Sequence, residues 1–329
     1  MIKYIFFNFF FLIFLCCNVL SKSSDSPNLD KNYENHLTWE NWIIKKKKEF
    51  KRINLQEKTI HYLDSIKFNS KVIELDRKQP EFRLTFDKYF NNRVTQKNKK
   101  KIVLKYKDNK KLLKKIEEDF GVNSKILLSL WGIETSFGKH TGNFDILRSL
   151  ASLAYDGRRK DFFSKELKNA LLILDKGHFD RNLFKGSWAG AFGQTQFMPS
   201  TFLKYALDFN GDKKINLFNK EDALASGANY LKKTGWDDEL QWGEKVDIKI
   251  SDNLKAISQK KIFKSTSFWK KKGAIFKNDF KKHNLLRLVI PDSNNNECYL
   301  VSKNFDVILG WNRSNYFALT VFLFSDEIK

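Results

Sequence analysis

Hydrophobic residues recur every three or four positions along much of the chain, which is the spacing of a helix with one buried face. We predict helices within the ranges 37–63, 108–120, 124–136, 160–175, 199–207, 220–233 and 314–326. Asn123 or Ser124 can cap the helix at 124–136. Asn219 or Lys220 can begin the helix at 220–233, and Gly235 ends it. The pattern therefore indicates a mainly helical protein.

The pattern changes after Trp242. Apolar and polar residues alternate over 246–250, the run 285–290 is apolar, and 299–301 follows a turn-like segment at 292–296. These segments predict short strands, which we group into a small β-rich insertion at about 243–310. The predicted fold class is α+β, mainly α, with a small β-rich subdomain, built around one cleft.

Glu134 is a carboxylate at a position where the helical pattern predicts a hydrophobic residue. In the helix at 124–136, it shares one face with Leu127, Leu130 and Trp131. A carboxylate among such side chains is poorly solvated when it is ionised, so its pKa should rise. A raised pKa is what a general acid needs at neutral pH. The spacing alone leaves open a partly buried Glu that forms a structural salt bridge with Lys or Arg.

Residues 1–21 have the features of a secretory signal peptide. Lys3 supplies an early positive charge, an apolar Phe-rich run follows, and Ser21 is a small residue at which cleavage can occur. The run is too short for a comfortable membrane span. Lipid modification of Cys17 is the alternative, which the bulky residues before it disfavour. We predict cleavage after about Ser21, followed by a polar, disordered leader at 22–36.

The formal net charge of +22 favours polyanionic partners such as nucleic acid, anionic lipid or a carboxylate-rich cell wall. Most of the 60 basic residues are Lys scattered along the whole chain, and no recognised nucleic-acid motif accompanies them. We therefore predict a solvated, Lys-rich surface and no nucleic-acid partner. Cys298 is the only cysteine after the predicted signal, so the core must hold the fold without an internal disulfide.

Several common site chemistries lack their motifs. The five His show no paired spacing for zinc, and there is no G-x-S-x-G elbow. The Gly-rich segment 186–199 follows no Val- or Ile-rich strand, which argues against a dinucleotide fingerprint. This segment offers Ser187, Gln194 and Gln196 as hydrogen-bonding groups suited to a sugar, and small residues for close approach. Taken alone, it also fits a tight structural turn.

Five blocks of sequence together resemble one known family. Their order and spacing are similar to those of the B-type lytic murein transglycosylases, and the blocks are 75–82, 131–138, 153–159, 186–199 and 311–314. The similarity extends from about Leu37 to the C-terminus. It implies a lysozyme-like catalytic domain over 37–329. It also implies that Glu134, in the E-T-x-x-G block, is the single catalytic acid/base of the family.

The resemblance further implies a reaction on peptidoglycan glycan strands in the periplasm of a Gram-negative cell. The family cleaves the β-1,4 bond between N-acetylmuramic acid and N-acetylglucosamine and forms 1,6-anhydro-N-acetylmuramic acid. Such chemistry requires no cofactor and no second carboxylate, unlike that of most glycosidases. The alternatives are a hydrolytic muramidase with the same acid and a non-catalytic peptidoglycan-binding protein. We expect a monomer, with membrane association through the signal region as the alternative to release.

The resemblance also implies site residues, position by position. The sugar subsites of the family correspond to Ser187, Gln196, Tyr230, Asn312 and, through a weaker match, Tyr89. Arg158 matches a position near the peptide stem, where a guanidinium can meet a carboxylate bidentately. Trp311 and Phe317 stand where some relatives carry Tyr, so we expect altered stacking and hydrogen bonding there.

A segment at 208–215 resembles the start of an EF-hand loop. Asp208, Asn210 and Asp212 place oxygen ligands at positions 1, 3 and 5, and the longer loop of the family closes with an Asp that matches Asp222. The Lys pair at 213–214 departs from this pattern, because it adds positive charge and replaces the usual Gly. We predict a structural calcium site, with a solvated turn as the alternative.

Overall fold

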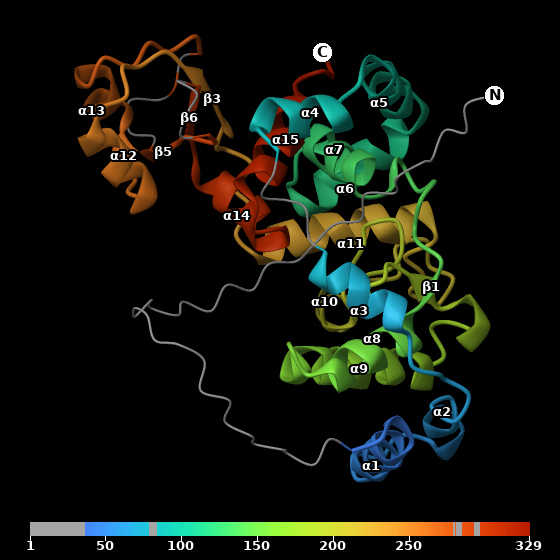
Figure 1. Ribbon diagram of the computed structural model, residues 1–329. Coiled ribbons are helices and arrows are strands. Elements are labelled where there is room, and N and C mark those ends of the chain that lie inside the picture. The colour runs from blue at the N-terminus through green and yellow to red at the C-terminus, as the bar shows by residue number, and fades with distance from the viewer. Residues whose placement is uncertain (1–36, 79–83, 279, 281–284, 293–296) are drawn as a thin grey trace, which may run out of the picture.

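The computed structural model describes residues 37–78, 84–278, 280, 285–292 and 297–329. The predicted signal peptide at 1–21 and the predicted leader at 22–36 lie outside the described residues, as do parts of the segments 75–82 and 292–296. In the described part of the chain, no helix combines the length and the apolar character needed to cross a membrane. These residues form a helical body with a smaller, β-containing unit at one end (Figure 1).

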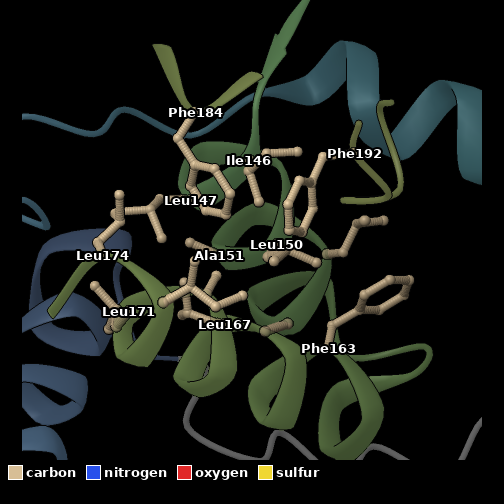
Figure 2. Close-up of a cluster of buried hydrophobic side chains, with 14 of the residues drawn as sticks. Ile146, Leu147, Leu150, Ala151, Phe163, Leu167, Leu171, Leu174, Phe184 and Phe192 are labelled. Atoms are coloured by element: carbon tan, nitrogen blue, oxygen red, sulfur yellow. The ribbon is translucent and has the colours of Figure 1, made fainter. Parts of the chain in front are cut away.

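One part of the helical body packs around a core of aliphatic and Phe side chains. Its helices are α1 (Trp39–Lys51), α2 (Glu57–His61), α3 (Ser70–Arg77), α8 (Ile146–Asp156), α9 (Lys160–Asp175) and α10 (Pro199–Tyr205). Figure 2 shows Leu147 and Leu150 of α8 among the side chains of α9, with Phe184 and Phe192 above them. Because Phe192 is fully buried in this core, it anchors the Gly-rich segment 186–199 to the body.

The second part of the body surrounds α7 (Ser124–Thr135). The other helices of this part are α4 (Phe86–Arg93), α5 (Gln96–Asp108), α6 (Lys110–Phe120), α11 (Lys220–Lys233), α14 (Lys303–Trp311) and α15 (Asn315–Ser325). Four of them, α5, α6, α11 and α15, pack against α7. Between the two parts, β1 (Phe144–Asp145) pairs antiparallel with β2 (Lys185–Gly186), which follows a 3-10 turn at Arg181–Leu183.

The β-containing unit is a four-stranded antiparallel sheet with two short helices. The strand order is β3-β6-β5-β4, and the strands are β3 (Gly243–Val246), β4 (Lys264–Ser265), β5 (Leu285–Val289) and β6 (Cys298–Val301). The helices α12 (Asp252–Gln259) and α13 (Thr266–Lys271) join them. Trp269 is fully buried in this small core and donates its indole N–H to the carbonyl of Leu286, 2.9 Å away. Cys298 is also buried there as a free thiol.

The predicted fold class, α+β and mainly α with a small β part, is confirmed. Helices α9 and α11 have the predicted bounds, 160–175 and 220–233. Asn123 and Asn219 are the side chains that cap α7 and α11, through the amides of Lys125 and Glu221.

Three details of the prediction were wrong. The strand predicted at 246–250 is instead Gly243–Val246, because its pairing with β6 ends at Val246. The helix predicted over 37–63 is two helices, since the chain turns at Asn54, which has a left-handed φ of 58°. The insertion predicted to be β-rich as far as about 310 contains two helices, and α14 already occupies Lys303–Trp311.

Candidate active site

Glu134 lies in the last turn of α7, at the centre of the body. Leu127, Leu130 and Trp131 are buried as predicted, but α7 is buried on further faces as well, because neighbouring helices enclose it. A Cβ added at Gly132 would lie 2.8 Å from the Phe137 ring and 2.9 Å from the Phe324 ring of α15, so at least one ring would have to move. Close packing therefore fixes the backbone that carries Glu134.

The carboxyl of Glu134 has one hydrogen-bond donor among the described residues. The indole Nε1 of Trp311, at the end of α14, donates to Oε1 of Glu134 at 2.8 Å. The residue is half-buried, and desolvation of its carboxyl raises the pKa to about 8, against the opposing effects of the Trp311 bond and the charge of Arg93. The structural salt bridge considered from the sequence is absent from the described residues, where no cation lies within bonding distance of this carboxyl. A pKa raised in this way is what a general acid needs at neutral pH.

Two of the predicted site residues, Gln196 and Tyr230, line a cavity together with Trp311, the residue that bonds Glu134. The volume of this cavity is about 130 Å³. The Tyr230 and Trp311 rings are 5.1 Å apart and nearly perpendicular, so Trp311 joins the cavity to Glu134. Gln196 has a left-handed φ of 50°, and its amide donates to the carbonyls of Thr141 and Gly193. A non-Gly residue held in this conformation is costly and is often found at functional sites.

Ser187 and Asn312 are buried and occupied by local bonds. Ser187 Oγ accepts from the amide of Ala191 at 3.0 Å, which closes the turn at the start of the Gly-rich segment. Asn312 follows Trp311 directly, and its Oδ1 accepts from the amide of Ser314 at 3.1 Å. The Asn312 side chain therefore holds the link between α14 and α15, next to the residue that bonds Glu134.

Gln194 has an internal role, which differs from the sugar contact suggested by the sequence. Its Oε1 accepts from the indole of Trp131 at 2.8 Å, and its Nε2 donates to the carbonyl of Phe218 at 2.6 Å. Its own carbonyl accepts from Thr135 Oγ1 at 2.7 Å. These bonds tie the Gly-rich segment to α7, so they fix the position of Gln196 relative to Glu134.

Tyr89 lies on α4 and is buried under a cation. The guanidinium of Arg93 lies 3.9 Å from the centre of the Tyr89 ring, and Tyr316 packs against the same ring at 5.5 Å. Arg93 is also the charge that acts on Glu134. Tyr89 therefore contacts Arg93, whose charge acts on Glu134. The Tyr89 side chain itself is buried.

Arg158 is not among the residues that line this cavity, and it has a carboxylate partner within the chain. Its Nε donates to Oδ2 of Asp76 at 2.7 Å, and its Nη2 donates to the Asp76 carbonyl at 3.0 Å. Arg159 pairs with the other oxygen of the same carboxylate. Arg158 nevertheless keeps 47% of its side-chain surface exposed, so one edge of the guanidinium remains open to a second anion.

A second carboxyl near the cavity escaped the sequence reasoning. Glu166 of α9 lines the same cavity and is 2% exposed. Both of its oxygens accept from Ser200, from the amide at 2.8 Å and from the hydroxyl at 2.6 Å. Burial raises the pKa of Glu166. Its apolar neighbours in α9 have the usual helical spacing, and the contact with Ser200 crosses between helices, so no local pattern reveals it.

The oxygen-bearing residues of the predicted calcium loop form a turn in the predicted order along the chain. Asp208 accepts from the amides of Gly211 and Lys213, both at 2.7 Å, and Lys213 has the left-handed φ of 68° that this turn requires. Asp222 is fully buried and accepts from three loop amides. In the described ranges, no three His, Cys, Asp or Glu side chains gather as a metal-binding group. The loop thus has the turn of an EF-hand, with its oxygens bonded to the backbone.

Comparison with known proteins gives this arrangement a context. The family described as "Transglycosylase SLT domain" matches residues 38–326. "Membrane-bound lytic murein transglycosylase B" of Escherichia coli (strain K12) is 44% identical over 118 residues, which are 36% of this chain and 33% of that protein. The matched region therefore spans about a third of the length of that relative.

Solved structures are similar over most of the chain. SltB3 from Pseudomonas aeruginosa, solved with NAG-NAM-pentapeptide, is 32% identical with a TM-score of 0.83, covering 88% of this chain and 79% of its own. It is also solved with NAG-anhNAM-pentapeptide. The Escherichia coli lytic transglycosylase Slt35, solved with calcium, is 27% identical with a TM-score of 0.75, covering 90% and 94%. The predicted lysozyme-like fold is confirmed, and the chain belongs to the transglycosylase SLT domain family.

Proposed function

We propose that the protein is a lytic transglycosylase of peptidoglycan. It would cleave the β-1,4 bond between N-acetylmuramic acid and N-acetylglucosamine and leave a 1,6-anhydro-N-acetylmuramic acid end. The observation that carries this proposal is Glu134, a desolvated carboxyl with a pKa raised to about 8, joined through Trp311 to a cavity that has polar and aromatic walls. Family membership over 38–326 supports the same reaction class.

The proposed reaction uses Glu134 twice. As the neutral acid, it gives its proton to the glycosidic oxygen while the bond from that oxygen to the anomeric carbon of the muramyl residue breaks. As the carboxylate, it then takes the proton of the muramyl 6-hydroxyl while that oxygen bonds to the anomeric carbon. The proton count balances, and no water is consumed. The substrate N-acetyl group or electrostatic support would stabilise the oxocarbenium ion between the two steps.

The residues around the acid suit the binding of a glycan strand. Tyr230 presents a ring beside Trp311, and Gln196 lines the same cavity with an amide oxygen that can accept from a sugar hydroxyl or acetamido N–H. Asn312 would act on the same subsites from its place directly after Trp311. Ser187 would shape the same subsites through its turn, and Tyr89 through Arg93. The exposed edge of Arg158 suits a carboxylate of the peptide stem.

Glu166 bears on the alternative of a hydrolytic muramidase. Hydrolysis with two carboxylates needs the second one to face the sugar or a water. Both oxygens of Glu166 are instead engaged by Ser200. This favours a mechanism with a single acid, in which Glu166 is a structural carboxyl.

Digestion of purified sacculi, followed by mass analysis of the products, tests the proposal. We expect muropeptides with the mass of the anhydro form, which is lower by one water than that of the hydrolytic product. Products with reducing ends would establish the hydrolytic alternative. Binding to sacculi without any release would establish the non-catalytic alternative.

We also propose calcium binding, export and a monomeric state for this chain. Calcium would be held by Asp208, Asn210, Asp212 and Asp222 and would have a structural role, because none of these residues is hydrogen-bonded to Glu134.

Export to the periplasm rests on the predicted signal peptide at 1–21. The match to murein enzymes supports peptidoglycan rather than nucleic acid as the polyanion that meets the positive surface.

A further inference from the structure

The indole of Trp311 is held rigidly beside the acid. It ends α14 and packs against Phe197 at 5.3 Å and Tyr230 at 5.1 Å, both in edge-to-face geometry. Gly310, the preceding residue, lies close under the Tyr230 hydroxyl, because a Cβ built there would be 3.4 Å from that oxygen. The ring therefore has little freedom to turn its N–H away from Glu134.

The bond from Trp311 distinguishes the two oxygens of Glu134. An indole N–H can only donate, and the carbonyl oxygen of a neutral carboxylic acid is a better acceptor than its hydroxyl oxygen. Because Nε1 donates to Oε1 at 2.8 Å, the proton of the neutral acid belongs on Oε2. In the described residues, Oε2 has no hydrogen-bond partner within the chain, so it is the oxygen left for the substrate.

We propose that Trp311 is a positioning residue that fixes the rotation of the Glu134 carboxyl, so that Oε2 alone exchanges the proton with the sugar. This inference rests on the proposed function, which it deepens by naming the oxygen that performs both proton transfers. In relatives that carry Tyr at this position, the phenol hydroxyl would have to donate the hydrogen bond that fixes the carboxyl.

The other groups near the acid do not substitute for this bond. Arg93 of α4 acts on Glu134 through its charge and is stacked on Tyr89. From α5, Lys101 donates to the carbonyl of Ser136 at 2.9 Å. The Tyr316 hydroxyl of α15 donates to Asp292, and the Tyr230 ring of α11 packs against the Trp311 ring. The indole N–H thus provides the one hydrogen bond that orients the carboxyl among the described residues.

The decisive experiment deletes the N–H and keeps the shape of the ring. Benzothienylalanine incorporated at position 311 replaces the indole N–H with sulfur, which leaves the packing on Phe197 and Tyr230 in place. Trp311→Phe is the simpler companion variant. Trp242→Phe is the matched control, because the Trp242 indole also donates to a carboxylate, Asp326 Oδ1 at 3.3 Å, in a half-buried position away from Glu134. The readouts are kcat and KM on sacculi across pH, and the titration of the Glu134 carboxyl by carbon-13 NMR, assigned with Glu134→Gln.

We expect the sulfur isostere to lower kcat by on the order of 10- to 100-fold, because misplacing a reacting group by a fraction of a bond length has costs of this size. KM should stay within about threefold, since the ring that the sugar meets is kept. The alkaline limb of the kcat profile and the Glu134 titration should both move to higher pH, because the lost N–H favoured the charged form. Trp242→Phe should change none of these.

A kcat and a titration equal to wild type in the isostere would overturn the inference. So would an equal loss in Trp242→Phe, which would indicate a general structural effect. The proposed function fails separately: if the wild-type chain releases nothing from sacculi, the reaction class is wrong, while the NMR titration still shows whether Trp311 bonds the acid.

Discussion

Two regions of this molecule surround a carboxyl group with different numbers of hydrogen-bond donors. At the end of α7, Glu134 has one hydrogen-bond donor, Trp311, and burial raises its pKa to about 8. At the start of α11, Asp222 is more deeply buried but accepts from the amides of Phe209, Asn210 and Asn216. The two carboxyl groups thus differ in the number of hydrogen-bond donors that surround them, one for Glu134 and three backbone amides for Asp222.

The contrast follows from how the two backbones are built. The loop at 208–216 turns back on itself and directs its N–H groups at Asp222, which solvate the carboxylate in place of water. Around Glu134, helices α5, α6, α11 and α15 satisfy their own N–H groups and present apolar side chains. These helices leave Glu134 with one donor, the Trp311 indole, and desolvation keeps the pKa of its carboxyl raised.

Replacing the acid should have the largest effect on the reaction. We expect Glu134→Gln to reduce cleavage of sacculi by at least 10²–10⁴-fold, roughly the contribution of general acid–base catalysis, while binding to sacculi is kept. Release of muropeptides is measured against Glu166→Gln, which changes the other buried carboxyl of this cavity and should keep activity within about tenfold. If Glu166→Gln abolishes release as completely, the mechanism uses two carboxyl groups.

Replacing the solvated carboxylate should affect stability instead. Asp222→Ala leaves three loop amides without their acceptor, and we expect a loss of about 3 kcal/mol or more in the free energy of unfolding. Asp212→Ala is the matched control in the same loop, because Asp212 is exposed and should cost far less. Urea titration of both variants tests this. Equal losses in the two variants would mean that the loop is stabilised as a whole and that the bonds to Asp222 contribute no more than those of Asp212.

The raised pKa of Glu134 has a cost in stability that depends on pH. The folded chain holds the Glu134 proton up to about pH 8, whereas the unfolded chain releases it near the ordinary value of 4.5. The folded state thus binds more protons across this window, so the free energy of unfolding falls as pH rises through it. Glu134→Gln lacks this titration, and we expect it to gain stability over wild type between pH 5 and 9, on the order of a few kcal/mol. If the difference in unfolding free energy between Glu134→Gln and wild type does not change with pH, the Glu134 carboxyl has an ordinary, solvated pKa.

The sequence could predict Glu134 because the signal is local: a carboxylate in a helix of Leu and Trp. The caps at Asn123 and Asn219 were predictable for the same reason. The Trp311 bond joins residues 177 positions apart, and the pair of Glu166 with Ser200 spans 34, so no periodicity could reveal them. Only the resemblance to a family drew attention to position 311, as a place where some relatives carry Tyr.

Gln194 and the strand at β3 show the other limit. Gln194 was grouped with Gln196 because both are amides in a Gly-rich segment, but the first faces inward to Trp131 and Phe218. The alternation over 246–250 was real, yet pairing with β6 stops at Val246. Side-chain type and alternation indicate which structures and contacts a segment can form. The partner strand or helix then determines which residues of the segment form them.

Calcium should have the smallest effect and should act on the loop alone. The charge of Lys213 and Lys214 indicates weak binding, in the range of about 10⁻⁴–10⁻³ M found for extracellular modules. An ion that binds only the folded state stabilises it by RT ln(1 + [L]/Kd), which is about 0.4–1.4 kcal/mol for millimolar calcium at this affinity, so the melting midpoint should rise by a few degrees at most. Asp212→Ala should lose this shift, whereas Glu134→Gln should keep it. If calcium raises the midpoint of Asp212→Ala as much as that of wild type, the loop is a solvated turn, and backbone amides alone hold its carboxylates.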